Sequence, residues 1–197
     1  MAQQSLARKQ VRPHTRRGVP HPMKDAPIEI VEYQLHWPAE FEREQAAISQ
    51  ALAPWLVATP EHIGSTAVPG LAAKPVIDIM APVASLDGSI GCLAAATRIG
   101  YVHFPYKPDL MHWFCKPSPE HRTHHLHLVP ANSRLWVERL AFRNALRSSE
   151  KLRMEYQELK CKLAEKHRGD REAYTEAKSP FIQRVVRTSF GGGNSAA

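Results

Sequence analysis

The stretch EHIGSTAVPGLAAKPVIDIM, residues 61–80, decides the fold that the sequence predicts. A Gly-Ser pair, Gly64 and Ser65, ends a short apolar run and is followed by a loop of small residues. The next run, Val76 to Met80, is apolar except for Asp78. Because an unpaired ionised carboxylate is costly in apolar surroundings, a buried strand that carries Asp78 indicates a metal-binding or phosphate-handling edge.

Patterning along the rest of the chain predicts a sheet domain followed by a helical unit, and therefore an α/β or α+β fold. Apolar runs with period two or with few polar breaks predict strands, and apolar residues at three and four spacing predict helices. The predicted extended segments are 28–33, 55–63, 76–83, 101–104, 110–116 and 124–129. The predicted helices are one from Pro38 to Pro54, one over 85–99 and three after Ser133.

These elements divide the chain into four parts. We expect a sheet domain over residues 27–130 and C-terminal helices over 131–190 that pack on it. Residues 1–26 are basic and hold little apolar content, and residues 191–197 are rich in small residues. Both end segments are therefore predicted to be disordered tails.

Charge is divided unevenly along the chain, whose formal net charge is +7. Residues 1–24 hold six Lys or Arg and no acid, which predicts at most weak, non-specific attraction to nucleic acid. Residues 25–130 hold six bases and eleven acids, a net charge of −5, whereas residues 131–197 hold fourteen bases and eight acids, a net charge of +6. This contrast favours either simple docking of the two units or a basic wall that closes over an anionic ligand.

Cysteine usage and hydropathy indicate the class of protein. The three cysteines, Cys92, Cys115 and Cys161, are widely spaced and form no CxxC pair, which argues against a disulfide scaffold or a zinc ribbon. No window approaches 18 consecutive apolar residues, so we expect no membrane span. Unpaired cysteines and an N-terminus without an apolar signal core predict a cytoplasmic protein.

The loop that opens the central stretch has the composition of a phosphate-binding turn. Gly64 lacks a Cβ and lets a phosphate approach the backbone, Ser65 adds hydroxyl and N–H donors, and we group the adjoining Thr66 with them. Lys74 adds a cation before the strand, and Asp78 offers a carboxylate to a divalent metal, Mg²⁺ or Mn²⁺. The alternative is that Asp78 forms a purely structural pair with Lys74 or with a histidine.

The predicted strand HHLHLV, residues 124–129, carries two histidines on one face. Side chains alternate along a strand, so His125 and His127 share a face while His124 lies on the other. Two histidines at this spacing bind a metal or a phosphate, or act as acid and base. We predict His127 as a metal ligand with Asp78, and His125 as the acid or base. The alternative is a hairpin whose histidines bond only to the backbone.

Basic residues on the predicted C-terminal helices form a third candidate set. Arg143 and Arg147 lie four residues apart, and Lys160 and Lys178 each follow a tyrosine by four residues, so each pair shares a helix face. We predict that Arg143, Lys160 and Lys178 neutralise a small phosphate-bearing ligand. The alternative is a helix face that only contacts solvent.

Four motifs together resemble the GrpB-like family: the run EHIGSTAVPGLAAKPVIDI, the strand HHLHLV, the helix start FRNALR and the closing YTEAKSPFI. The resemblance covers about residues 28–187. It implies the fold of the nucleotidyltransferase superfamily, in which a mixed sheet is flanked by helices. Some members of the family are fused to dephospho-CoA kinase.

In nucleotidyltransferases a Gly-Ser turn holds nucleotide phosphates, and carboxylates on the following strand bind the metal that bridges them. The resemblance therefore implies that Gly64 and Ser65 form this turn and that Asp78 is the first metal carboxylate. Met80 stands where a second carboxylate is usual, and the later strand offers histidines instead of a third. Two hypotheses follow. The protein is an enzyme that transfers a nucleotidyl or phosphoryl group to a small substrate, or it is a module that binds a nucleotide or a CoA-like metabolite without turnover.

Overall fold

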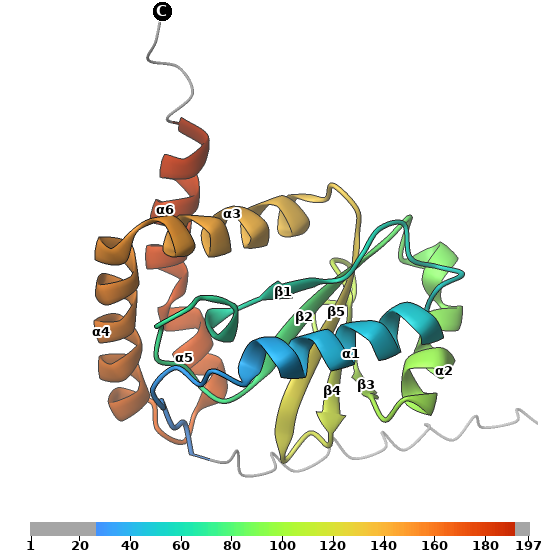
Figure 1. The fold of residues 1–197 in the computed structure, drawn as a ribbon, viewed down its shortest axis with the longest axis horizontal. Helices are drawn as coiled ribbons and strands as arrows, with labels where there is room; N and C mark the ends of the chain where they lie inside the picture. The colour runs from blue at the N-terminus through green and yellow to red at the C-terminus, as the bar shows by residue number, and fades with distance from the viewer. Residues whose placement is uncertain (1–26, 192–197) are drawn as a thin grey trace, which may run out of the picture.

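A computed structural model describes residues 27–191, which form one five-stranded sheet surrounded by helices (Figure 1). The predicted basic tail, residues 1–26, lies outside the described residues. Of the predicted tail 191–197 only Gly191 is described, and it is the last residue of a helix. No helix between residues 27 and 191 is both long enough and apolar enough to cross a membrane.

The sheet is mixed, with the strand order β1-β2-β5-β4-β3. Strand β2 pairs in parallel with β5, and the other neighbouring strands are antiparallel. This mixed sheet with flanking helices confirms the predicted α/β or α+β class. The strands are β1 (Glu61–Ile63), β2 (Ile77–Val83), β3 (Val102–Phe104), β4 (His112–Pro117) and β5 (Arg122–Pro130).

The helices begin where the sequence supplies capping groups or a proline. Pro38 lies in the first turn of the first helix, and the side chains of Ser133, Ser149 and Asp170 each accept a backbone N–H at the start of a later helix. Within the described residues the helices are α1 (Trp37–Ala51), α2 (Gly91–Arg98), α3 (Arg134–Ser148), α4 (Glu150–Lys166), α5 (Arg171–Ala177) and α6 (Ser179–Gly191), with 3₁₀ turns η1 (Ser65–Ala67) and η2 (Asp87–Ser89).

The predicted strand over residues 28–33 is wrong. This segment makes a single isolated bridge, between Val31 and Ala73. Its apolar residues pack in two directions instead: Ile28 contacts the cluster that contains Ala164 and Tyr174, and Val31 packs against the main core. The alternation of apolar and acidic residues thus reflects packing against neighbouring elements and not membership of the sheet.

Three other boundaries also differ from the predictions. Of the extended segment 55–63 only β1 belongs to a strand, and the helix predicted over 85–99 begins at Gly91, after a short 3₁₀ turn. The third C-terminal helix is divided into α5 and α6 next to Pro180. A proline has no N–H to donate and its ring clashes with the preceding turn, so it starts α6 instead of continuing α5.

One face of the sheet is covered by α1 and α2 and holds the main core. Ile77 and Ile79 of β2, together with Leu126 of β5, pack there against Ile48 of α1 and Ala95 of α2. All five side chains are almost fully buried. This layer fixes β2 and β5 side by side, and it therefore also fixes the residues that these strands direct to the other face.

The opposite face of the sheet is covered unevenly. Met80 and Val129 are fully buried there, and Trp136 and Leu140 of α3 pack against their cluster. Asp78, His125 and His127 share this face but lie beyond the part that α3 covers. Helices α4, α5 and α6 stand beside the sheet (Figure 1). Residues of these helices and the polar side chains of the sheet line a common cavity.

Candidate functional site

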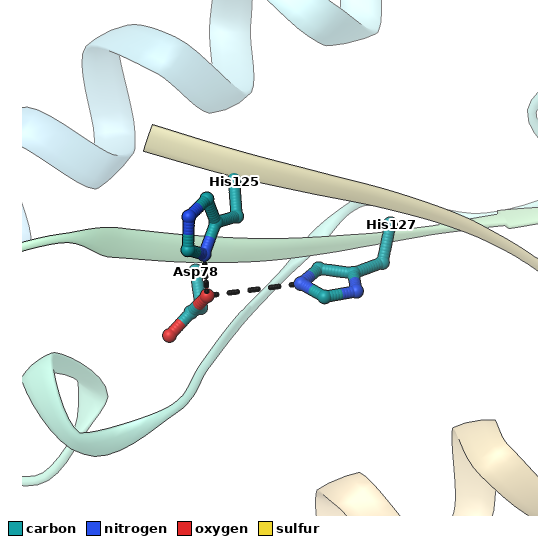
Figure 2. Close-up of side chains that lie close together, drawn as sticks. All are labelled: Asp78, His125 and His127. Atoms are coloured by element: carbon teal, nitrogen blue, oxygen red, sulfur yellow. Dashed lines mark hydrogen bonds and ion pairs between the residues drawn. The ribbon is translucent and has the colours of Figure 1, made fainter. Parts of the chain in front are cut away.

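Asp78, His125 and His127 form a compact cluster on β2 and β5 (Figure 2). His125 Nδ1 lies 2.8 Å from Asp78 Oδ1, and His127 Nε2 lies 3.7 Å from the same oxygen. The ligand atoms that the three residues offer all lie within 4.8 Å of one another. The structure thus brings together the carboxylate and both histidines that the sequence analysis selected.

Strand register explains this convergence. In the parallel pairing of β2 with β5, Asp78 is opposite His125 and Met80 is opposite His127. Side chains two residues apart point to the same face, so the two histidines of β5 flank the single carboxylate of β2. A one-residue shift of the register would move the carboxylate to the apolar face.

Met80 stands two residues after Asp78, where the resemblance to nucleotidyltransferases led us to expect a second carboxylate, and its surroundings explain why an acid does not fit. Its side chain is fully buried in the cluster formed with Ile63, Trp113 and Val129. An ionised group in this apolar layer would lose its hydration without a partner. The polar part of the face is therefore limited to Asp78 and the two histidines.

The histidine rings leave two buried nitrogens without a hydrogen-bond partner within the described structure. These are His125 Nε2 and His127 Nε2. His127 Nδ1 lies 3.3 Å from Met111 Sδ, whose thioether is only a weak acceptor. Since buried polar groups in folded proteins are nearly always paired, two neighbouring unpaired imidazole nitrogens call for an explanation.

The protonation states in the cluster suit a metal ligand set. Burial raises the pKa of the Asp78 carboxyl, but the hydrogen bond from His125 and the neighbouring His127 outweigh burial and hold that pKa well below its usual range. Burial lowers the pKa of His127, and Asp78 offsets only part of this effect. An ionised carboxylate and a neutral imidazole are the forms that bind a metal. The donors, their spacing and the unpaired Nε2 of His127 therefore fit a divalent metal.

Gly64 leaves room for the carboxylate of Asp78. Its φ of +74° lies in the region that favours glycine, and a Cβ built on it would lie 2.4 Å from Asp78 Oδ2. From the sequence we predicted that Gly64 lets a phosphate approach the backbone. The close approach in the structure is instead to the carboxylate, and Gly64 does not line the neighbouring cavity.

A cavity of about 400 Å³ lies against the cluster, between the sheet and the C-terminal helices. Its wall contains eight of the ten residues that the sequence analysis selected: Ser65, Thr66, Lys74, Asp78, His125, His127, Lys160 and Lys178. Residues far apart in the sequence thus meet in one cavity. Gly64 and Arg143 are the two selected residues that do not line it.

Two lysines of the C-terminal helices face this cavity over tyrosine rings. Lys160 Nζ lies 5.1 Å from the ring centre of Tyr156 and donates to Ala72 O, and Lys178 Nζ lies 4.0 Å from the ring centre of Tyr174. Burial and the charge of Lys178 lower the pKa of Lys160 to about 7. Burial and other nearby cations lower the pKa of Lys178 to about 8. An anion in the cavity would relieve this repulsion.

Thr66 is held by a structural hydrogen-bond chain. Its hydroxyl donates to Val76 O at 3.1 Å and lies 3.1 Å from His62 Nε2, so His62 donates to Thr66 Oγ1. Phe41 stacks on the His62 ring at 4.6 Å, and burial lowers the pKa of His62 to about 4. His62 thus supports the Gly-Ser turn from below, as a scaffold residue.

Arg143 and Arg147 lie away from the cavity. Arg143 Nη1 bonds to Glu61 Oε2 at 2.6 Å and to His62 O at 2.9 Å, and Arg147 Nε donates to Ala67 O at 2.9 Å. These contacts connect α3 to β1 and η1. Arg143 therefore does not line this cavity. Helix spacing predicts that the two arginines share a face, but not which surface that face contacts.

Several lining residues were not selected from the sequence. Arg139 lies four residues before Arg143 on α3, and Trp113 lies on β4 beside His127 in the register. Alternation along LMHWFCK places Trp113 on one face with Cys115. Only the pairing register with β5 shows that His125 and His127 lie on the same face. Arg122 lies over the Trp113 ring at 5.3 Å. Arg122, Arg139 and Arg171 add to the cationic wall.

Comparison with known proteins identifies the family. The model of the family described as GrpB protein matches residues 27–188. A UPF0157 protein of Pseudomonas aeruginosa is 36% identical over 168 residues, which cover 82% of this chain and 67% of that protein. A protein of Alkalihalophilus pseudofirmus, named glutamate-rich protein GrpB, is 30% identical over 162 residues, 80% of this chain and 92% of that protein.

A solved structure gives the same result. The crystal structure of conserved protein GrpB from Enterococcus faecalis matches with a TM-score of 0.75 at 33% sequence identity. The match covers 83% of this chain and 98% of that one. It spans the sheet and the helices described above, and it agrees with the resemblance drawn from the four motifs. The chain belongs to the GrpB family.

Proposed function

We propose that this protein binds a small phosphate-bearing molecule in the cavity between the sheet and the C-terminal helices, with the help of a divalent metal. Asp78 and His127 would hold the metal. Ser65, Lys160 and Lys178 would bind phosphate oxygens. The class of ligand that fits this chemistry includes nucleotides and CoA-like metabolites.

One observation carries the proposal: metal donors and lysines line the same cavity. A metal at Asp78 and His127 and the ammonium groups of Lys160 and Lys178 would act on one anion from two sides. Phosphate oxygens accept bonds both from metals and from lysines. Carboxylates oppose such binding, and within residues 27–191 only Asp78 and Glu172 contribute carboxylates to the lining.

Group transfer is the second candidate function, and the Asp78–His125 pair favours it. The carboxylate accepts a hydrogen bond from His125 Nδ1 at 2.8 Å, which leaves Nε2 as the nitrogen that exchanges a proton. In that role His125 would act as acid or base while a phosphoryl or nucleotidyl group moves to a small acceptor. Against this candidate, Asp78 is the only carboxylate of the metal cluster, whereas two-metal transfer needs more acidic ligands.

A thermal-unfolding screen of the full chain tests the proposed function. The probes are pyrophosphate, ATP, CoA and glucose 6-phosphate, each with and without Mn²⁺ or Mg²⁺. A ligand present at about 100 times its Kd adds about 2.7 kcal/mol to the free energy of unfolding. For a chain of this size we expect the phosphate compound to raise the Tm by about 5–10 °C above the value with metal alone, and to have no such effect without metal.

Two lysine variants show whether the cavity is responsible. Lys178→Met should abolish the shift in Tm, because it removes a cation from the cavity wall. Lys162→Met is the matched control, since Lys162 is an exposed lysine of α4 that does not line the cavity. Equal loss of the shift in both variants would contradict the proposal, and so would a shift that persists in Asp78→Asn.

A further inference from the structure

We propose that Asp78, His125 and His127 form a three-ligand site for a first-row transition-metal ion, and that His125 is the third ligand. This inference rests on the metal in the proposed function and goes further: it names the class of metal and excludes Mg²⁺ as the preferred ion. It also changes the role of His125, which becomes a metal ligand.

The types of donor in the cluster favour a transition metal. Mg²⁺ prefers an octahedron of oxygen ligands and is usually bound by carboxylates, phosphates and water. The cluster offers two imidazoles and only one carboxylate. Imidazole suits zinc, iron, copper and nickel, and two histidines with one carboxylate are a recurrent ligand set of transition metals. Cluster chemistry thus favours a transition metal over Mg²⁺.

The distances between the donor atoms are close to those around a single metal ion. Ligands at about 2.0–2.2 Å from one metal lie about 3–3.5 Å apart when they are neighbours in its coordination shell. Asp78 Oδ1 lies 2.8 Å from His125 Nδ1 and 3.7 Å from His127 Nε2. These separations lie on either side of the expected range. Small side-chain rotations would bring all three donors onto one ion, since their ligand atoms already lie within 4.8 Å of one another.

A buried, unpaired nitrogen of His127 also points to an ion. His127 Nε2 faces Asp78 across 3.7 Å, too far for a hydrogen bond, and has no other partner in the described structure. A purely structural Asp78–His125 pair would leave this nitrogen unexplained. An ion between the carboxylate and His127 satisfies it. His127 is buried and Asp78 is held against Gly64, so both ligands are preorganised.

Direct metal binding to the untagged full chain tests the inference. After treatment with a chelator, the protein is titrated with Co²⁺, whose visible absorption reports its ligands, and with Zn²⁺ in competition. We expect one ion per chain and no displacement by Mg²⁺ at 1,000-fold excess. His125→Gln and His127→Gln should each weaken binding by at least about 10-fold, since even outer partners of metal ligands contribute that much.

His124→Gln is the matched control. It changes the same residue type on the same strand, but His124 shares the other face and lies 2.9 Å from Thr123 Oγ1. Its metal affinity should equal that of the unchanged protein. Thermal unfolding without metal shows whether each variant folds. If a histidine variant does not fold, the near-isosteric Asp78→Asn replaces it and should show the same loss of affinity.

The outcomes separate this inference from the proposed function. Displacement of Co²⁺ by an equal concentration of Mg²⁺ would overturn the inference, as would full affinity in His125→Gln. A phosphate compound that stabilises the protein equally with Mg²⁺ and Mn²⁺ would also overturn it, although the proposed function would stand. Tight Co²⁺ binding that depends on both histidines, without any effect of phosphate compounds, would support the inference and refute the proposed function.

Discussion

At the scale of single residues, the contact between Gly64 and Asp78 determines the geometry of the site. Gly64 takes a φ of +74°, and the carboxylate of Asp78 occupies the space where a side chain of residue 64 would lie. His125 holds the same carboxylate from the other strand. Asp78 is thus held between a glycine and a histidine, and any side chain at position 64 would displace it.

Gly64→Ala should therefore destabilise the protein by about 1–3 kcal/mol and weaken metal binding, because the Cβ meets Asp78 Oδ2 and the backbone is strained. Urea unfolding and Co²⁺ titration measure the two effects. Gly70→Ala is the control, since Gly70 has a similar φ of +75° but no atom within 4 Å of an added Cβ. It should show only the backbone cost and unchanged metal affinity. Equal metal affinity in both variants would contradict the role of Gly64.

Residue patterns predicted the cluster but not the whole cavity. Alternation in HHLHLV placed His125 and His127 on one face, and the carboxylate within an apolar run marked Asp78, so local pattern was enough for these three. Helix spacing shows that Arg143 and Arg147 share a face, while tertiary packing decides that this face contacts β1 and η1 and not the cavity. Trp113 was missed because alternation alone does not give the register that places it opposite His127.

At the scale of elements, α3 covers only part of the sheet face that carries Asp78, His125 and His127. Trp136 and Leu140 pack on the cluster that buries Met80, while the Asp78 end borders the cavity. Ser133 is the N-cap of this helix, and its side chain accepts the N–H of Trp136 at 3.3 Å.

The order of strands and helices was largely predictable from periodicity. The structure of segment 28–33 was not, because packing against helices also produces an alternation of apolar and polar residues.

Ser133→Ala should lower the free energy of unfolding by about 1 kcal/mol, since it removes the N-cap of α3. For a chain of this size the Tm should fall by about 2–4 °C. Ser148→Ala is the control: its hydroxyl donates to Ala145 O at the exposed end of the same helix, and its loss should change the stability by less than about 0.5 kcal/mol. Calorimetry compares the two variants, and equal Tm values would contradict the capping role.

At the scale of the whole molecule, the C-terminal helices supply cations to a cavity whose proposed metal ligands come from the sheet. Lys160 and Lys178 are separated from Asp78 by more than 80 residues of sequence, yet they line the same cavity. The charge contrast between the sheet domain and the helices indicated this arrangement, although it fitted simple docking equally well. The convergence on one cavity favours the second interpretation, a basic wall over an anion.

The buried ammonium of Lys160 should make stability depend on pH. Its pKa falls from 10.5 in the unfolded chain to about 7 in the folded protein. Below pH 7 the cost of the buried charge is fully present; above it the unfolded chain binds more protons, and stability rises with pH. Urea unfolding between pH 6.5 and 8.5 should show this rise. Lys160→Met should flatten it, and an unchanged slope in that variant would contradict the assignment.

Calorimetric titration of pyrophosphate into the full chain loaded with Mn²⁺ tests the central claim most directly. We expect pyrophosphate to bind at one site per chain. Its affinity should be at least about 10-fold weaker in EDTA and in Asp78→Asn. The affinity should also fall as the pH rises through 7 to 8, because Lys160 and Lys178 lose their protons. Pyrophosphate binding of equal affinity with Mn²⁺, with EDTA and in Asp78→Asn would contradict the central claim.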